Sequence, residues 1–146
     1  IIAGIKMVTN LERMGDYAVH LAQMATVEEY EDCIPFVEQI SEMALLGATM
    51  TRKAVEAFMD VKAEKAIEVA AMDDRMDEAR RTVNAGLVSV KPSSEKKMER
   101  LYNLFYLAKE MERFGDHVTT ICSWIVYMAN GERPKLNLPK EQSEKL

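Results

Sequence analysis

Two short acidic motifs have residue types and a spacing that could bind a metal ion. Residues 12–16 read Glu-Arg-Met-Gly-Asp, and residues 112–116 read Glu-Arg-Phe-Gly-Asp one hundred positions later. On a helix, the first and last residues of each motif lie on one face, about 6 Å apart. Like charges at this spacing destabilise a helix by roughly 0.2–0.5 kcal/mol, and a glycine costs about 1 kcal/mol more than an alanine. Because both copies accept both penalties, a multivalent cation held by carboxylate oxygens is the simplest compensation.

A third acidic segment has the same spacing. Asp73 and Asp77 are four residues apart, and Asp74 and Glu78 lie beside them. If the helix that carries this segment packs antiparallel against the helix of residues 112–116, both acid pairs face one groove. Carboxylates gathered there raise one another's pKa values unless a cation intervenes. The alternative is a solvated acidic face, in which nearby arginines pair with the acids.

These motifs provide six candidate metal ligands, which are Asp73, Asp77, Glu112, Asp116, Glu12 and Asp16. All-oxygen ligation suits magnesium, calcium, manganese or iron in a carboxylate-bridged cluster. For the acids of residues 12–16, a solvated charged face explains the pattern equally well, because the helices that would face them are absent from the chain.

The composition predicts one compact, packed domain. The chain has 146 residues, of which 48% are hydrophobic and 29% charged, so a core can form and disorder is not expected. Methionine is abundant (11 residues), whereas glycine (6) and proline (4) are too rare for a β-protein with many tight turns. The net charge of −5 and the lack of a basic stripe argue against a nucleic-acid-binding surface.

The cysteines and apolar runs indicate a cytoplasmic protein. Cys33 and Cys122 are isolated, without the C-x-x-C spacing of a metal or redox site, which fits a reducing cytoplasm. The longest apolar run, residues 118–129, is too short to span a bilayer. The chain begins at Ile1 within a helical pattern, so we interpret it as a fragment whose natural N-terminal part is missing.

The spacing of apolar residues predicts four long helices and therefore an all-α, antiparallel helical bundle. We expect these helices at residues 1–29, 35–59, 61–88 and 95–130. The buried stripe of the first helix is expected to be Ile5, Val8, Leu11, Gly15, Ala18, Ala22 and Ala25. That of the second is expected to be Ile40, Met43, Gly47, Met50, Ala54 and Ala57. The last helix has an apolar face broad enough to contact more than one neighbour.

Local signals predict where these helices begin and end. Pro35 suits the first turn of the second helix, and Asp60 is expected to cap the third. Ser93 or Ser94 is expected to cap the last helix, which ends at Gly131.

The order Glu-Arg-x-Gly-Asp, followed by a small and apolar helix, resembles the signature of the PhoU family of phosphate-uptake regulators. Members of that family are built from two three-helix repeats. The resemblance implies that residues 1–29 are the last helix of an incomplete first repeat and that residues 30–131 are a complete second repeat. Residues 132–146, with two prolines and mixed charge, are expected to form a mobile tail. The sequence Met-Asp-Asp-Arg-Met-Asp at 72–77 looks like the acidic motif of the family's middle helix.

The resemblance also implies a cofactor and partners. Some family members hold metal clusters in paired acidic motifs and others work without metal, so the expectation is a divalent or trivalent cluster of iron, Mn, Mg or Zn, or none. The implied function is negative regulation of phosphate transport and phosphate-starvation signalling, through contacts with the phosphate ABC transporter and its sensor histidine kinase. A homodimer without nucleic acid is expected, in the cytoplasm or peripherally at the inner face of the membrane through the transporter.

Histidines and arginines also lie in or near the motifs. His20 and His117 are the only histidines, and His117 follows Asp116, so it points about 100° away from that residue on a helix. This favours a surface histidine. Arg13 and Arg113 are interpreted as tethers for neighbouring carboxylates, with partner recognition as the alternative. The glycines of both motifs are expected to let a helix or a metal come close.

Two other functions are compatible with acid-rich helices. A carboxylate-bridged dimetal enzyme usually carries Glu-x-x-His on two helices, but Tyr17 and Phe114 occupy the positions three residues before the two histidines. A metal-free helical interaction module would need no ligands. Metal analysis of the purified protein separates this metal-free module from the metal-binding regulator and from the dimetal enzyme. Oxygen-dependent turnover would identify the enzyme. No nucleophile triad, kinase motif or nucleotide loop is visible, so we assign no catalytic residue.

Overall fold

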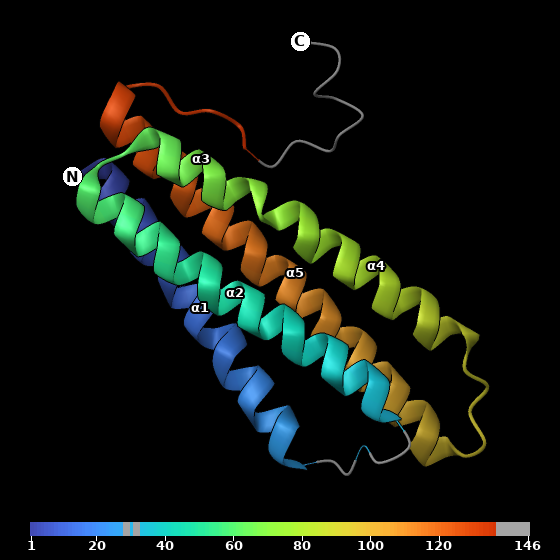
Figure 1. The fold of residues 1–146 in the computed structure, drawn as a ribbon. Helices are drawn as coiled ribbons and strands as arrows, with labels where there is room; N and C mark the ends of the chain where they lie inside the picture. Colours follow the sequence, from blue (N-terminus) through green and yellow to red (C-terminus); the bar gives the residue numbers. More distant parts are fainter. Residues whose placement is uncertain (28–29, 31–32, 137–146) are drawn as a thin grey trace.

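The computed structural model describes residues 1–27, 30 and 33–136, nearly all of them in helices. The helices are α1 (Ile2–Val27), α2 (Ile34–Asp60), α3 (Ala63–Ala71), α4 (Asp73–Ser89) and α5 (Glu95–Asn130). Figure 1 shows them as long rods lying side by side, with α3 and α4 forming one rod and successive rods running in opposite directions. The described residues contain no strand, so the predicted all-α, antiparallel bundle is confirmed. None of the described helices carries an apolar run long enough to cross a lipid bilayer.

α5 forms the centre of the bundle. It packs against all four other helices, whereas α1 makes its main contacts with α5 alone. The short link between α2 and α3 makes these helices antiparallel neighbours, as their spacing in the sequence predicted. The broad apolar face predicted for the last helix is therefore confirmed, because three other rods share it.

The predicted third helix, residues 61–88, is interrupted at Met72, which separates α3 from α4. The backbone of Met72 stays in the right-handed helical region (φ −67°, ψ −20°), so the two helices continue nearly along one line (Figure 1). At the break, the Met72 N–H bonds the Val69 carbonyl three residues back, as in a 3₁₀ turn. The interruption makes Asp73 the first residue of α4, where the helix dipole favours negative charge.

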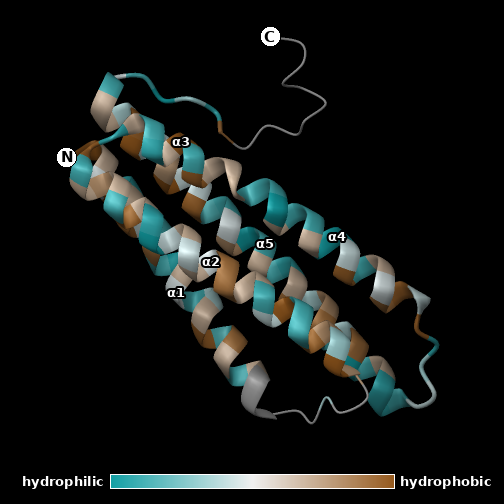
Figure 2. Cartoon of the chain, in the orientation of Figure 1, coloured by the Kyte–Doolittle hydropathy of each residue, from teal (hydrophilic) through white to brown (hydrophobic). Residues whose placement is uncertain are grey.

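Apolar stripes of the later helices form the core. All six residues predicted for the stripe of α2 are buried. On α5, buried residues occur along most of the helix and include Leu104, Met111, Val118 and Ile125. Figure 2 shows hydrophobic and hydrophilic residues alternating along each helix. Full burial of a Leu, Met or Val side chain contributes about 1.5–3 kcal/mol, so these stripes hold the rods together.

The stripe predicted for α1 lies on the wrong face. Six of its seven residues are exposed, namely Ile5, Val8, Leu11, Gly15, Ala18 and Ala22. The side chain of the seventh, Ala25, lies outside the described part. The side of α1 that packs on α5 instead carries Met7 and Met14, which are buried. Both faces have helical spacing, but large methionines bury more apolar surface than a stripe made partly of glycine and alanine. α1 therefore keeps a second apolar face toward solvent.

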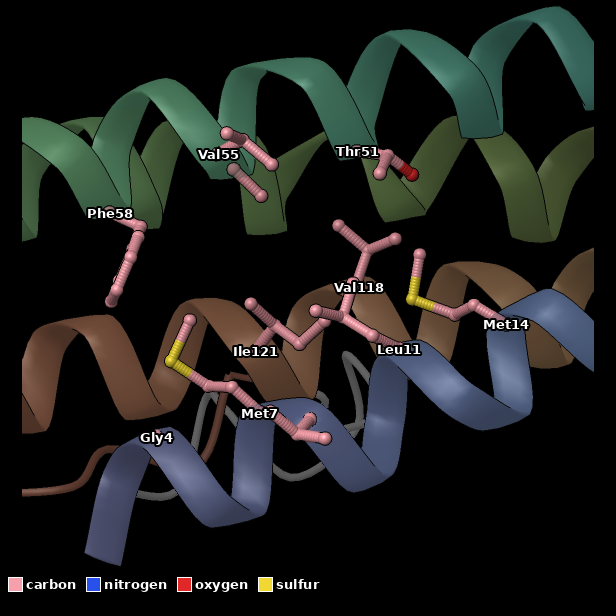
Figure 3. A pocket seen from close by; sticks show the side chains of 11 residues that line it. Gly4, Met7, Leu11, Met14, Thr51, Val55, Phe58, Val118 and Ile121 are labelled. Atoms are coloured by element: carbon pink, nitrogen blue, oxygen red, sulfur yellow. The ribbon is translucent and has the colours of Figure 1, made fainter. Parts of the chain in front are cut away.

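An apolar groove of about 320 Å³ lies between α1, α2 and α5. Figure 3 shows Met7 and Leu11 approaching it from α1, with Val55 and Phe58 of α2 opposite. Leu11 and its neighbour Val8 line the groove and also belong to the exposed face of α1, where Val8 is 64% exposed. Groove and face therefore form one continuous apolar surface.

Most of the predicted helix ends are confirmed. Pro35 lies in the first turn of α2, and the Ser94 hydroxyl accepts a backbone N–H of the first turn of α5. Gly131 ends α5 with a φ of 80°. Asp60 does not cap α3, because it is the last residue of α2 and its carboxylate pairs with a lysine of α3. The chain turns directly after it, through Val61 in the left-handed region.

The segment after α5 stays close to that helix where the structure describes it. The Arg133 guanidinium lies over the Trp124 ring, 4.3 Å from its centroid, and Leu136 packs against the core. Residues 137–146, the larger part of the predicted mobile tail, lie outside the described residues.

Candidate acidic site between α4 and α5

Asp73 lies at the centre of the acidic site. Its Oδ1 atom is buried and has no hydrogen-bond partner among the described residues. The carboxylate lies against Gly115 of α5, where an added Cβ atom would overlap it. The prediction that Gly115 permits a close approach is thus confirmed. A buried carboxylate oxygen without a partner is unfavourable, so this position favours a proton or a cation.

The other three acids predicted on these two helices are close enough to act on Asp73. Burial is the main reason that the pKa of Asp73 rises from 3.8 to about 7. The charges of Asp116, Asp77 and Glu112 raise it further, in that order. The packing of α4 on α5 therefore brings together both acid pairs, as their spacing predicted. Near neutral pH, Asp73 is divided between its protonated and ionised forms.

Glu112 also has an altered environment. Burial raises the pKa of Glu112, and the carboxylates of Asp116 and Asp77 act in the same direction. The Arg80 guanidinium opposes them, because its Nε atom lies 2.9 Å from Glu112 Oε1. One acid of the site is therefore paired with an arginine from the other helix. The pairing within one segment that the alternative interpretation predicted occurs instead between Arg81 and Glu78.

The four acids are not gathered into a completed metal site. Within the described part of the chain, no three Asp, Glu, His or Cys side chains converge on a position where one ion would bind. The donor set nevertheless fits a hard cation, because all its ligand atoms are carboxylate oxygens. A cation would also partner the buried oxygen of Asp73 and lower its raised pKa. The residues that would hold it are Asp73, Asp77, Glu112 and Asp116.

The first motif copy is separate from this site. Glu12 and Asp16 are exposed on α1, and neither is among the charges that shift the pKa of Asp73 or Glu112. A Cβ atom on Gly15 would meet no other atom within 4 Å. The two copies differ because α4 faces only the second one. Four of the six predicted ligands therefore lie near one another, although no three of them converge among the described residues, and two lie apart.

A polar contact that the sequence analysis missed joins α1 to α5. His20 Nδ1 lies 3.0 and 2.9 Å from the two carboxylate oxygens of Glu110, which is only 4% exposed. The Tyr106 hydroxyl hydrogen-bonds the same carboxylate, which raises the pKa of Tyr106. The sequence did contain a sign that Glu110 is buried and needs a partner, because Glu110 interrupts an apolar face three residues after Leu107.

His117 is not the simple surface histidine that we predicted. It is partly buried between helices, and its Nδ1 atom lies 2.8 Å from Asn10 Oδ1. Its ring stacks on Tyr17, with the ring centroids 5.7 Å apart. The spacing of residues on α5 could not reveal this environment, because both partners belong to α1.

Arg13 and Arg113 form no ion pair that would tether a carboxylate among the described residues, although Arg113 lowers the pKa of its neighbour Glu112. Both side chains are exposed, and neither takes part in an ion pair within the described residues. Both lie near His117, whose pKa is lowered by burial and then by Arg13. Asp116 opposes this change, and Arg113 lowers the pKa by a smaller amount. The packing of α1 on α5 therefore brings the arginines of both motif copies close to one histidine.

Comparison with known families gives a match that includes the acidic site. A family model described as the PhoU domain matches residues 40–125. The matched segment covers most of α2, all of α3 and α4, and most of α5. The division of the chain into two repeats stays a prediction.

Curated relatives resemble nearly the whole chain. A phosphate-specific transport system accessory protein PhoU homolog from Clostridium acetobutylicum is 28% identical over 137 residues, which are 94% of this chain and 63% of the relative. A homolog of the same description from Pseudomonas aeruginosa is 30% identical over 133 residues, which are 90% of this chain and 54% of the relative. The chain thus spans between about half and two thirds of these relatives.

A solved structure shows a similar arrangement of helices. The crystal structure of the phosphate transport system regulatory protein PhoU from Streptococcus pneumoniae superposes with a TM-score of 0.74 at 26% sequence identity. The superposition covers 92% of this chain and 63% of the solved one.

Proposed function

This chain belongs to the PhoU domain family, and from that premise we propose that it is a regulatory helical scaffold of a phosphate uptake system. It acts as a negative regulator of phosphate transport and of phosphate-starvation signalling, through protein contacts and without enzymatic activity. Support comes from the relatives, which are described as accessory or regulatory proteins of phosphate transport.

We further propose that the scaffold binds a metal ion between α4 and α5. The observation that carries this proposal is the Asp73 carboxylate, which is buried against Gly115 with one oxygen unpartnered and three further acids nearby. When bound, a cation such as iron, Mn, Mg or Zn supplies positive charge that offsets the repulsion of the acids and stabilises the contact of the two helices. Arg80 holds Glu112 in place beside this position.

Metal analysis tests this proposal. We expect protein prepared without chelator to carry metal, and calorimetric titration of the stripped protein with Mn²⁺ to give saturable binding. Asp73→Asn, Asp77→Asn and Asp116→Asn should each weaken binding about tenfold or more, because even an outer partner of a metal ligand contributes that much. Asp60→Asn, at an exposed carboxylate of α2, is the matched control and should bind as the unchanged chain does. Equal metal content in all of these proteins would rule out the ligand assignment.

We propose a separate metal site for the acids of the first motif copy. Glu12 and Asp16 would form part of a second site whose remaining ligands lie on another helix. Glu12→Gln with Asp16→Asn should therefore leave the Mn²⁺ affinity of the α4–α5 site unchanged. A joint loss of binding would instead show that all six acids belong to one site.

We propose the phosphate ABC transporter and its sensor histidine kinase as partners, contacted in the cytoplasm at the inner face of the membrane. The description of the relatives as accessory to a phosphate-specific transport system supports the first partner. Binding of the purified chain to the detergent-solubilised transporter and to the kinase tests both, with Arg13→Gln and Arg113→Gln as the variants expected to weaken contact. Absence of binding to both partners would contradict the proposal.

A metal-free interaction module is the second candidate function. The Arg80–Glu112 ion pair favours it, because it compensates one acid without a cation. Metal-free protein that still binds its partners would select this candidate. A dimetal enzyme has less support, because His20 and His117 make hydrogen bonds to Glu110 and Asn10 rather than to the acidic site.

A further inference from the structure

An ion pair lies at one end of the acidic site. The Nε atom of Arg80, on α4, is 2.9 Å from Oε1 of Glu112, on α5. The two side chains are 32% and 23% exposed, so solvent and salt screen their attraction less than that of a pair on the open surface. The Nε–H group makes no hydrogen bond among the described residues, so the contact rests on charge. Such a contact is easier to exchange than a bidentate pair of hydrogen bonds.

The charged residues follow one order along the contact between α4 and α5. On α4, Asp73, Asp77 and Arg80 are separated by four and three residues and therefore share one face. On α5, which runs in the opposite direction, Asp116 lies toward Asp73 and Glu112 lies toward Arg80 (Figure 1). Glu112 is thus between a guanidinium group on one side and the other acids of the site on the other side.

This position subjects Glu112 to opposing influences. Burial raises the pKa of Glu112, the Arg80 guanidinium opposes that rise, and the charges of Asp116 and Asp77 add to it. With Glu112 paired to Arg80, no three acids converge on one position within the described residues. A cation bound to the Glu112 carboxylate would lie a few ångströms from the guanidinium, and two positive charges so close repel each other strongly where water is partly excluded.

We propose that Arg80 competes with the metal ion for Glu112: it pairs with this carboxylate in the metal-free chain and releases it when the four acids bind a cation. This inference rests on the metal site proposed above. It makes the metal-free and metal-bound forms two states of one site, which differ in the partner of Glu112. Arg80 therefore lowers the affinity for metal, and it replaces the cation as the positive charge between α4 and α5 when no metal is present.

Other roles for Arg80 lead to different results when the residue is replaced. If Arg80 only orients Glu112 as a ligand, its removal should weaken metal binding. If the ion pair is merely structural, its removal should leave the metal affinity unchanged. Competition alone requires tighter binding without the arginine.

Calorimetric titration of the stripped full chain with Mn²⁺ distinguishes these roles. We expect Arg80→Gln to bind Mn²⁺ about fivefold more tightly than the unchanged chain, because the cation no longer has to displace a partly buried ion pair. Arg81→Gln is the matched control. It removes the same charge at the next position, where the arginine pairs with Glu78 on the exposed side of α4, and it should bind as the unchanged chain does. Weaker or unaltered binding by Arg80→Gln would overturn the proposal.

A double-mutant cycle identifies the group for which Arg80 competes. In a chain that carries Glu112→Gln, the further change Arg80→Gln should no longer tighten Mn²⁺ binding, because the carboxylate that both cations share is absent. Equal tightening with and without Glu112 would show that the guanidinium repels the metal from a distance, which contradicts competition.

Urea unfolding supplies a readout that does not depend on the titration. With chelator present, Arg80→Gln should lower the urea concentration at the midpoint, because it removes an ion pair between α4 and α5. At saturating Mn²⁺ the same change should have little effect, since Arg80 has already been released. An equal decrease under both conditions would show that the ion pair survives metal binding and would refute the proposal.

The failure of this inference can be told apart from the failure of the metal site. Saturable Mn²⁺ binding that Arg80→Gln does not tighten refutes competition and leaves the metal site standing. Absence of Mn²⁺ binding in both proteins refutes the metal site and competition together. Binding by Arg80→Gln alone supports competition, because it shows that the arginine prevents the cation from binding.

Discussion

At Gly115, the absence of a side chain makes room for the Asp73 carboxylate, whereas Gly15 at the matching place of the other motif copy faces open space. The glycine at the same position of the motif therefore has a different environment in each of the two copies. The glycine of the second copy allows an acid of α4 to be buried against α5. The difference arises from the neighbouring helix and not from the motif itself.

These two glycines form a matched pair of substitutions. Gly115→Ala should destabilise the fold by up to about 2 kcal/mol, because the new Cβ atom overpacks the contact with Asp73 at a cost of about 1–3 kcal/mol, and the helix preference of alanine offsets about 1 kcal/mol of that cost. Gly15→Ala should be neutral or stabilise by up to about 1 kcal/mol, because alanine is the better helix former and nothing obstructs it. Denaturant unfolding of both variants measures the difference. Equal changes in the free energy of unfolding would contradict the role of Gly115.

Asp73 should make the stability of the metal-free chain depend on pH. Its pKa of about 7 in the folded chain is above its ordinary value of 3.8, so between these values the folded state binds more protons than the unfolded state. The contribution is fully present below about pH 4 and is lost as the pH rises through about 7. Because the side chain is partly exposed, we expect an effect on the order of 1–2 kcal/mol.

The Asp73→Asn variant isolates this effect because it cannot ionise. Relative to the variant, the unchanged chain should lose stability between pH 5 and pH 7.5 in the presence of chelator, as measured by urea unfolding. Mn²⁺ added at pH 7.5 should stabilise the unchanged chain and have little effect on the variant. A constant difference between the two proteins across this pH range would show that Asp73 ionises normally.

Among the helices, α1 is the one that depends most on a single neighbour. Its main packing partner is α5, and a buried acid of that helix is bonded by His20 of α1. Because the Glu110 carboxylate is only 4% exposed, its bond to His20 fixes the orientation of α1 as well as attaching α1 to α5.

Removing this contact should loosen α1 selectively. His20→Ala leaves the buried Glu110 carboxylate with fewer partners, which should cost about 1–3 kcal/mol. Hydrogen exchange should accelerate in α1 and change little in α2. Thr9→Ala, at an exposed position of α1, is the control and should leave exchange unaltered. Unchanged protection of α1 in the His20→Ala variant would show that apolar packing alone holds the helix.

At the scale of the whole molecule, the exposed apolar face of α1 and the groove beside it form an apolar surface that the described part of the bundle leaves uncovered. Leu11 is 44% exposed and lines that groove. Apolar surface of this kind is typical of an interface with another protein. The homodimer that the family resemblance implies would cover it with a second copy of the chain.

Sedimentation tests the proposed homodimer. We expect the unchanged chain to sediment as a dimer at micromolar concentration and Leu11→Glu to sediment as a monomer with the same helicity. Val88→Glu, at a residue of α4 that is 79% exposed, provides the control and should remain dimeric. A monomeric unchanged chain, or a Leu11→Glu variant that stays dimeric, would exclude an interface through α1.

Spacing along the chain was sufficient for several features that lie within one helix, although it missed the interruption at Met72. It predicted an all-α bundle, the complete buried stripe of α2 and the acid pairs on α4 and α5. The reason is that a helix has a fixed repeat, so residues three and four apart share a face wherever the helix is placed.

Only the tertiary structure decided which helix lies opposite each face. α1 has two apolar faces with the same repeat, and the choice between them depends on how much surface each one buries against α5. The same applies to Arg80, which pairs with Glu112, and to His117, which contacts α1. These partners are brought together by packing between distant segments, and no periodicity within a single segment contains that information.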